Sequence, residues 1–226
     1  MKLSLVFPIL EERKAILQSA QDLVSFWSRF PVEIEVVLVL DPGRGTSAAG
    51  LEEELSTLLS SQNSRLSFKV LAQKSRQGRG AAVLRGLNEA SGEILAVNSL
   101  DLSIPLGEVF SALQEFILDR ERSFLLLGNR RGAKKKRKYA HRGARHFFEN
   151  AEHEKAQSLQ VKDPTTPFFM LKKKDWSELQ IPKLRSWFYT PQIIQAARRK
   201  GLEVRDLEIQ CTDRVSSKLR WRDGLL

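Results

Sequence analysis

The chain has 226 residues, of which 42% are hydrophobic, with 13 Gly and 8 Pro, a composition that excludes disordered, collagen-like and low-complexity proteins. Its 37 Lys and Arg against 27 Asp and Glu give a net charge of +10, which favours nucleic acid, an anionic membrane face or phosphorylated substrates as partners. One cysteine, Cys211, and three His exclude an internal disulfide and a thiolate or imidazole metal cluster, and they indicate a reducing compartment.

The apolar stretches are short. None approaches the ~20 residues that a membrane-spanning helix needs. The first apolar run, residues 3–7, is too short for a signal peptide and is followed by Glu11 and Glu12. We therefore expect a cytoplasmic protein.

The first 130 residues alternate short apolar runs with longer amphipathic segments. The short runs are nearly continuously apolar, as strands buried on both faces of a parallel sheet require, and they predict strands at residues 3–7, 34–40, 66–72, 94–98 and 124–128. Apolar residues that recur every three to four positions predict helices at residues 16–27, 51–59, 82–90 and 109–117. This alternation indicates βαβ units in a doubly wound sheet, whose ligands bind at the carboxyl ends of the strands.

The pattern changes after residue 128. Residues 128–146 carry nine Lys and Arg and no acidic residue. Beyond them we expect a helix at about 141–157, short strands near 168–171 and 203–210, and a helix at 191–200 with Pro191 near its start and Gly201 at its end. Because no linker or repeat interrupts the chain, residues 1–226 are predicted to form a single domain.

Two polar segments follow the second and third predicted strands. Asp41, before Pro42 and Gly43, either accepts hydrogen bonds from a ribose or base edge or only starts a turn. The sequence Gly78-Arg79-Gly80-Ala81-Ala82 opens a helix, where free N–H groups and Arg79 suit a phosphate. The alternative is that these small residues only let the helix and the sheet pack closely. A dinucleotide-binding fingerprint does not fit, because its glycines directly follow the first strand.

Two further segments carry charge that suits a diphosphate. Asp101 follows the fourth predicted strand, where a carboxylate either helps to hold a divalent cation against a diphosphate or caps a turn. Near the end of the chain, Arg214, Lys218, Arg220 and Arg222 either clamp phosphates or form a solvated basic tail.

Taken in order, these segments resemble the motifs of the family 2 glycosyltransferases of GT-A fold, most closely the dolichol- or polyprenyl-phosphate mannosyl- and glucosyltransferase branch. Residues 8–12 are similar to P-x-x-N-E, residues 41–44 to D-D-G-S, residues 78–94 to N-x-G-K-G-A-A…G-L…A-x-G-D, and residues 99–103 to D-x-D-L-S. Residues 128–130 resemble G-S-R, residues 163–168 resemble D-x-T-S-G-F, and residues 200–218 resemble the family's closing G-x-x-v-x-E-v-P…R…S-K.

The resemblance implies an α/β GT-A fold with a mostly parallel central sheet and helices on both faces. Residues 1–130 would bind a nucleotide-sugar, and residues 131–226 would bind the acceptor and the diphosphate. The implied reaction is an inverting transfer of a sugar from a GDP- or UDP-linked donor to a polyprenyl phosphate or related acceptor. The reaction would take place at the cytoplasmic membrane face. Its cofactor would be Mg²⁺ or Mn²⁺.

The resemblance also implies roles for individual residues. Asp101 and Arg130 would be catalytic, Asp101 by facing the metal and Arg130 by holding the acceptor phosphate. The nucleotide-sugar would be bound by Pro8, Glu12, Asp41, Arg79, Ser99, Arg214 and Lys218.

The basic run after residue 130 fits an acceptor site beside an anionic membrane, where each basic residue contributes roughly 1 kcal/mol. Phe147 and Phe148 would add apolar insertion. The alternative is a solvated loop without a partner. The acceptor and membrane residues are predicted to be Arg130, Arg131, Lys134, Lys135, Lys136, Arg137 and Lys138.

The chain departs from the family pattern at residues that carry chemistry. Ser99 replaces the first metal-binding Asp, and Pro42 replaces an acid. Either the diphosphate and Asp101 hold the cation together, or Arg214 and Lys218 neutralise the diphosphate without metal. Further departures are Pro167 for Gly, Phe169 for Arg and Gln192 for Glu.

These substitutions leave a second hypothesis, a degenerate GT-A domain that binds a nucleotide, lipid or protein and catalyses nothing. A nucleic-acid binder is a third. Because no zinc finger, RNA-recognition motif or basic-zipper pattern accompanies the charge, a specific nucleic-acid partner is not expected.

Overall fold

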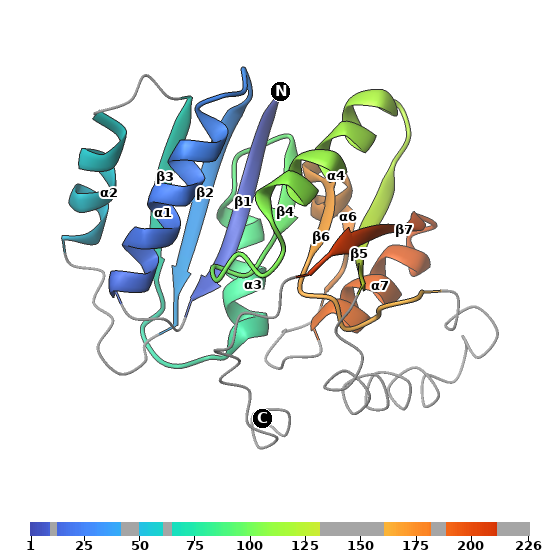
Figure 1. Ribbon diagram of the computed structural model, residues 1–226. Coiled ribbons are helices and arrows are strands. Elements are labelled where there is room, and N and C mark those ends of the chain that lie inside the picture. The colour runs from blue at the N-terminus through green and yellow to red at the C-terminus, as the bar shows by residue number, and fades with distance from the viewer. Residues whose placement is uncertain (10–12, 42–49, 61–64, 132–160, 182–188, 212–226) are drawn as a thin grey trace.

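A computed structural model describes residues 1–9, 13–41, 50–60, 65–131, 161–181 and 189–211 of the chain (Figure 1). The strands are β1 (Lys2–Ile9), β2 (Glu33–Leu40), β3 (Leu66–Ala72), β4 (Ile94–Val97), β5 (Phe124–Arg131), β6 (Phe169–Lys172) and β7 (Glu203–Gln210). The helices are α1 (Arg13–Trp27), α2 (Leu51–Ser60), α3 (Arg79–Glu89), α4 (Leu106–Leu118), α6 (Lys173–Glu178) and α7 (Tyr189–Arg199). The helix predicted at residues 141–157 lies outside the described residues.

The described strands form one sheet in the order β3-β2-β1-β4-β6-β5-β7. The pairs β1–β2, β2–β3, β1–β4 and β5–β7 are parallel, whereas β6 is antiparallel to both β4 and β5. The predicted mostly parallel sheet is therefore confirmed. Strands from both halves of the sequence contribute to it.

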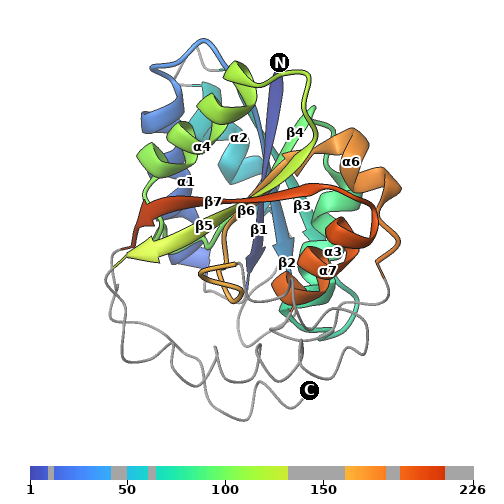
Figure 2. The ribbon, with the colours of Figure 1, turned by 90° about the vertical axis from the view of Figure 1, so that its right-hand side faces the viewer.

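Helices cover both faces of the sheet, as the sequence predicts. One apolar core lies between the sheet and α1, α2 and α4, and a second lies between the sheet and α3, α6 and α7. Figure 2 shows these two groups of helices on opposite sides of the sheet. Strand β1 supplies both cores: Leu3, Leu5 and Phe7 belong to the first, and Val6 belongs to the second. Such double-sided burial explains its nearly continuous apolar sequence.

The element boundaries differ from the predictions in a few places. Strand β5 continues to Arg131 instead of ending near residue 128, and helix α6 was not predicted. Helix α6 has only six residues, too few for a periodic pattern, and is fixed by Trp176, which is buried and donates to Asn88 Oδ1 at 2.9 Å. Helix α7 ends at Arg199, and Gly201 closes it as predicted: its φ of +78° turns the chain so that Leu202 N donates to the carbonyl of Ala197 at 2.9 Å. No described helix is long and apolar enough to cross a membrane.

A polar cluster ties the amino ends of the central strands together. Glu35, on β2, is buried and accepts hydrogen bonds from Ser4 Oγ, from Ser91 N at 2.7 Å and from Ser91 Oγ at 2.8 Å. Ser4 Oγ in turn accepts a hydrogen bond from Gly92 N at 2.8 Å. Burial acts to raise the pKa of Glu35, but the hydrogen bonds and the charge of Lys2 outweigh it, so the pKa lies below its ordinary value of 4.5.

The first prediction concerns the contact between α3 and the sheet. A Cβ at Gly86 would come within 2.3 Å of Val6 Cγ1 and 2.9 Å of Val39 Cγ2. Gly86→Ala is therefore expected to lower the free energy of unfolding by about 1–3 kcal/mol, measured by urea denaturation. The matched control is Gly107→Ala in α4, where a Cβ would meet nothing within 4 Å and helix propensity should add up to about 1 kcal/mol. Equal effects of the two changes would contradict the close packing of α3.

The second prediction concerns pH. Because the pKa of Glu35 is lower in the folded chain, its contribution to stability is present above the unfolded value of 4.5 and is lost as pH falls through the folded pKa. Glu35→Gln should cost about 1.5–3 kcal/mol near neutral pH and progressively less below pH 4.5. Denaturant unfolding at several pH values measures this, with exposed Glu53→Gln as the control. A cost independent of pH would refute the assignment.

Candidate functional site

Four parallel strands end at the same edge of the sheet. Strands β1 and β2 point toward this edge in Figure 1, and β3 and β4 run parallel to them. The polar segments that follow β2, β3 and β4 begin at Asp41, Gln73 and Asn98. All three residues are buried, so this edge carries polar side chains where an ordinary core would end in apolar ones.

Asp41 fixes the loop between β3 and α3. Its side chain is 2% exposed, and its N–H donates to the carbonyl of Ile9 at 3.0 Å. Oδ1 accepts a hydrogen bond from Gln77 N at 2.8 Å, and Oδ2 accepts one from Gly78 N at 2.9 Å. Asp41 therefore binds backbone 36–37 residues further along the chain, while the turn predicted after it lies outside the described residues. Its predicted hydrogen bonds to a ribose or base edge stay a prediction.

Arg79 connects the start of α3 to the loop after β4. Gly78 precedes the helix with a φ of +89°, a conformation that glycine adopts readily, and as the N-cap residue it has no side chain that could cap the helix. Arg79 is the first helical residue, and its Nη2 donates a hydrogen bond to Ser99 Oγ at 2.8 Å. Two residues predicted to bind the nucleotide-sugar are thus in direct contact.

The loop after β4 is held from several sides. Asn98 is fully buried, and its Oδ1 accepts from Ser99 N at 2.7 Å while its Nδ2 donates to Ile104 O at 3.3 Å. Ser19 of α1 donates to Leu100 O at 2.8 Å. The loop also contains Leu102, whose φ of +49° is unusual for a non-glycine residue and persists because this side chain is buried in the core.

Asp101 lies within this loop and is partly exposed. Its Oδ1 accepts a hydrogen bond from Ser103 N at 3.1 Å, which is the turn-capping role that the sequence left open. Among the described residues, nothing donates to its Oδ2. One carboxylate oxygen is therefore available for a ligand at the edge where Arg79 and Ser99 meet.

The described residues do not fit the metal site that the D-x-D motif implies. Ser99 replaces one carboxylate, and its hydroxyl oxygen already accepts a hydrogen bond from the positively charged guanidinium of Arg79. Asp101 is the one acidic residue of this loop, and the described part of the chain contains no group of three or more His, Cys, Asp or Glu that could hold a metal ion. Hard divalent cations prefer anionic oxygen ligands, whereas a guanidinium at this position repels them.

Arg130 forms an ion pair inside the second half of the fold. Its Nε donates to Asp163 Oδ2 at 2.6 Å, and its Nη2 donates to Asp163 Oδ1 at 3.0 Å and to Thr165 O at 3.1 Å. Asp163 is 1% exposed, and the Arg130 side chain is 16% exposed. The structure thus gives Arg130 a positioning role for residues 163–165, and its predicted contact with an acceptor phosphate stays a prediction.

The other predicted site residues are placed less directly. Pro8 is buried within β1, opposite Val39 of β2, so it is packed in the sheet. Arg131 is the last residue of β5. The remaining predicted residues lie outside the described residues: Glu12, Lys134, Lys135, Lys136, Arg137, Lys138, Arg214 and Lys218.

Sequence reasoning assigned no role to two residues at the carboxyl edge. Asn98 orders the β4 loop as described above. Gln73 is 6% exposed, its N–H donates to Leu40 O at 2.9 Å, and its buried Nε2 has no hydrogen-bond partner among the residues that the structure describes. The signal that marks both is a polar residue placed directly after a parallel strand, which is buried for Asn98 and lies at the sheet edge for Gln73.

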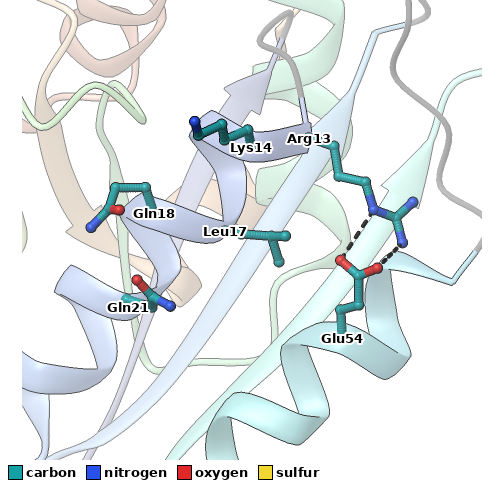
Figure 3. Close-up of a pocket in the computed structure, with 6 residues that line it drawn as sticks. All are labelled: Arg13, Lys14, Leu17, Gln18, Gln21 and Glu54. Carbon is teal, nitrogen blue, oxygen red and sulfur yellow. Dashed lines mark hydrogen bonds and ion pairs between the residues drawn. The ribbon is translucent and has the colours of Figure 1, made fainter.

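A shallow hollow lies elsewhere, between α1 and α2. It has a volume of about 430 Å³ and is lined by Arg13, Lys14, Leu17, Gln18, Gln21 and Glu54 (Figure 3). Arg13 spans it by donating to Glu54 from Nε at 3.1 Å and from Nη2 at 2.7 Å. Because these side chains are mostly exposed and none belongs to the loops after β2, β3 or β4, we do not assign the hollow to the site.

Comparison with known proteins agrees with this architecture. The sequence model of the family described as Glycosyl transferase family 2 matches residues 4–179. No curated protein matches the chain.

Similar solved structures include two of glucosyl-3-phosphoglycerate synthase from Mycobacterium tuberculosis. The complex with phosphoglyceric acid has 19% identity and a TM-score of 0.65, and the complex with Mg²⁺ and uridine diphosphate has 18% and 0.62. Each match covers 99% of this chain and 74% of that one. A mannosyltransferase from Pyrobaculum calidifontis in complex with GDP-Man and Mn²⁺ has 15% identity and a TM-score of 0.62, covering 96% of this chain and 57% of that one. At these identities the matches show the fold, and they confirm the predicted GT-A architecture.

The third prediction concerns the Arg130–Asp163 pair. Asp163→Asn leaves the guanidinium without its buried counter-charge and is expected to lower the free energy of unfolding by about 3–5 kcal/mol. Glu178→Gln is the control, because its pair with Lys200 at 3.0 Å is 57% and 49% exposed and should contribute less than about 1 kcal/mol. Guanidinium chloride unfolding measures both. A similar small loss in the two variants would show that the buried pair does not support residues 163–165.

Proposed function

The chain belongs to glycosyl transferase family 2, and from this premise we propose that it transfers a sugar from a GDP- or UDP-linked donor to a polyprenyl phosphate or related phosphate acceptor. Residues 1–130 would bind the donor, and residues 131–226 would bind the acceptor and the diphosphate. The observation that carries the proposal is the contact of Arg79 with Ser99 beside Asp101, at the carboxyl ends of parallel strands. A ligand in an open α/β sheet binds at that edge.

The proposed donor chemistry is supported by the solved structures of similar fold. One of them contains uridine diphosphate and another contains GDP-Man. Arg79 supplies a guanidinium whose planar fork matches phosphate oxygens. The first N–H groups of α3 point out of its N-terminus and add partial positive charge there. Both features suit a donor diphosphate.

The reaction is a single displacement at the anomeric carbon. An oxygen of the acceptor phosphate forms the new bond to that carbon, while the bond to the donor diphosphate breaks and the nucleoside diphosphate leaves with the electron pair. The acceptor phosphate is already an anion, so no general base is needed to activate it. The main task of the protein is to stabilise the charge that develops on the leaving diphosphate, and Arg79 would supply positive charge for it.

Asp101 has a separate role in this scheme. Its Oδ2 would accept a hydrogen bond from a hydroxyl of the donor sugar and so orient the anomeric carbon toward the acceptor. Two of the structures of similar fold contain Mg²⁺ or Mn²⁺. Because Ser99 and Arg79 do not fit a two-carboxylate site, no step of this mechanism passes through a metal ion.

The acceptor is proposed from charge. The net charge of +10, with nine basic residues in positions 128–146, favours an acceptor presented at an anionic membrane surface on the cytoplasmic side. One structure of similar fold contains phosphoglyceric acid, a small phosphate-bearing molecule. A lipid phosphate and this small phosphate ester both carry a phosphate group that a basic acceptor site would bind.

A second candidate is a non-catalytic domain that binds a nucleotide, lipid or protein. The observation that favours it is the pair Ser99 and Arg79, since the first metal-binding carboxylate of the family motif is absent. The two candidates differ in turnover, because only an enzyme releases nucleoside diphosphate.

The fourth prediction tests turnover. The protein is mixed with GDP- and UDP-sugars and either polyprenyl phosphate in anionic vesicles or 3-phosphoglycerate, and nucleoside diphosphate release is measured. We expect release with one donor and greater release with the lipid acceptor. Asp101→Asn should lower kcat by about 10–100-fold, the value of one charge-assisted hydrogen bond. Asp22→Asn, on α1, is the control and should leave kcat unchanged.

The outcomes separate the candidates. Nucleotide binding without release from any donor would refute the enzyme and support the binding domain. Release that requires 3-phosphoglycerate and is absent with the lipid would replace the proposed acceptor and leave the transferase intact.

A further inference from the structure

We propose that this chain meets the charge of the donor diphosphate with Arg79 in place of a divalent cation, so that nucleotide binding is independent of metal. The inference rests on the proposed function, because it concerns how that donor is held. It is carried by the residues at the position where the D-x-D motif places its first carboxylate.

Two side chains meet at that position, and neither is a carboxylate. Ser99 is neutral, and the group that contacts it is the guanidinium of Arg79, with Nη2 at 2.8 Å from Ser99 Oγ. An arginine side chain stays protonated at every physiological pH. A neutral side chain in contact with a guanidinium therefore stands where the family motif would place a carboxylate. A divalent cation is repelled at this point, and a diphosphate is attracted to it.

The loop after β4 offers a metal ion a single carboxylate. The carboxylate that the loop retains belongs to Asp101, and one of its oxygens is occupied by Ser103 N at 3.1 Å. Magnesium bound by a single protein carboxylate depends on substrate oxygens and waters for its remaining ligands. Such a cation would compete with Arg79 for the same diphosphate oxygens.

Arg79 is held in place by the residues on either side of it. Its backbone follows Gly78, whose N–H is bound by the buried Asp41 carboxylate at 2.9 Å. Its partner Ser99 is fixed by Asn98 Oδ1, which accepts from Ser99 N at 2.7 Å. Arg79 is thus held between two ordered loops before any ligand binds. Charge that is already in place needs little reorganisation to stabilise a leaving diphosphate.

The primary test uses the unmodified full-length protein. Isothermal titration with UDP and with GDP is carried out in EDTA and in Mn²⁺. The inference predicts that the nucleotide that binds does so with Kd values within about twofold of each other in the two conditions. Binding that appears only with Mn²⁺ would overturn the inference and leave the proposed function standing. Failure of both nucleotides to bind in either condition would overturn the inference and the proposed function together.

A substitution assigns the effect to the arginine. Arg79→Gln should weaken binding of the nucleoside diphosphate in EDTA about 10-fold or more, while binding of the matching nucleoside, followed by NMR, stays unchanged. The control is Arg122→Gln, which removes the same charge from a side chain that is 72% exposed before the amino end of β5. Equal weakening of nucleoside and nucleoside diphosphate would contradict a role at the phosphates.

A second variant tests the inference even if Arg79→Gln does not fold. Ser99→Asp places a carboxylate against the guanidinium, so it should weaken nucleotide binding in EDTA and make it respond to Mn²⁺. The expected change is an affinity at least about fivefold higher with Mn²⁺ than with EDTA. If Ser99→Asp binds nucleotide as the unmodified protein does in both conditions, Arg79 does not replace the cation.

Discussion

The candidate site depends on one buried carboxylate. Asp41 is 2% exposed, and each of its oxygens accepts a backbone N–H from the loop that precedes α3. A buried charge is tolerated only where such donors compensate for lost hydration. The same two hydrogen bonds fix the start of α3, which sets where Arg79 extends from the helix. Since Arg79 then reaches Ser99, Asp41 at the end of β2 and the loops after β3 and β4 are joined at one edge by this single constraint.

The two ends of the sheet use buried polar groups differently. At the amino end, Ser4 and Ser91 both donate to Glu35, and within the described residues both carboxylate oxygens accept hydrogen bonds, so this cluster stabilises the fold. At the carboxyl end, Asp101 and Gln73 keep polar atoms without hydrogen bonds to described residues. A buried polar atom of this kind, such as Gln73 Nε2, is costly, and it lies at the end of the sheet where α/β proteins bind ligands.

The sequence predicted most of the scaffold because strands buried on both faces are nearly continuously apolar and the covering helices are amphipathic. The sequence also predicted the end of α7, because Gly201 follows the helix and glycine adopts a positive φ more easily than other residue types. It could not predict that β6 is antiparallel to its neighbours, which depends on chain path. Nor could it predict the Arg79–Ser99 and Arg130–Asp163 contacts, which join residues 20 and 33 positions apart. Arg214 and Lys218 lie outside the described residues, so their predicted roles stay predictions.

Family membership and local chemistry therefore support different levels of the account. Membership and the GT-A fold support our proposal that a donor binds at the carboxyl ends of the parallel strands, and the contact of Arg79 with Ser99 supports our proposal for how its charge is met. The most direct measurement is a crystal structure of the protein with UDP or GDP bound in the presence of Mn²⁺. The account predicts the diphosphate at the carboxyl ends of the parallel strands, against the Arg79 guanidinium and without a bridging cation. A nucleotide bound on another surface, or a Mn²⁺ ion held between the diphosphate and Asp101, would contradict it.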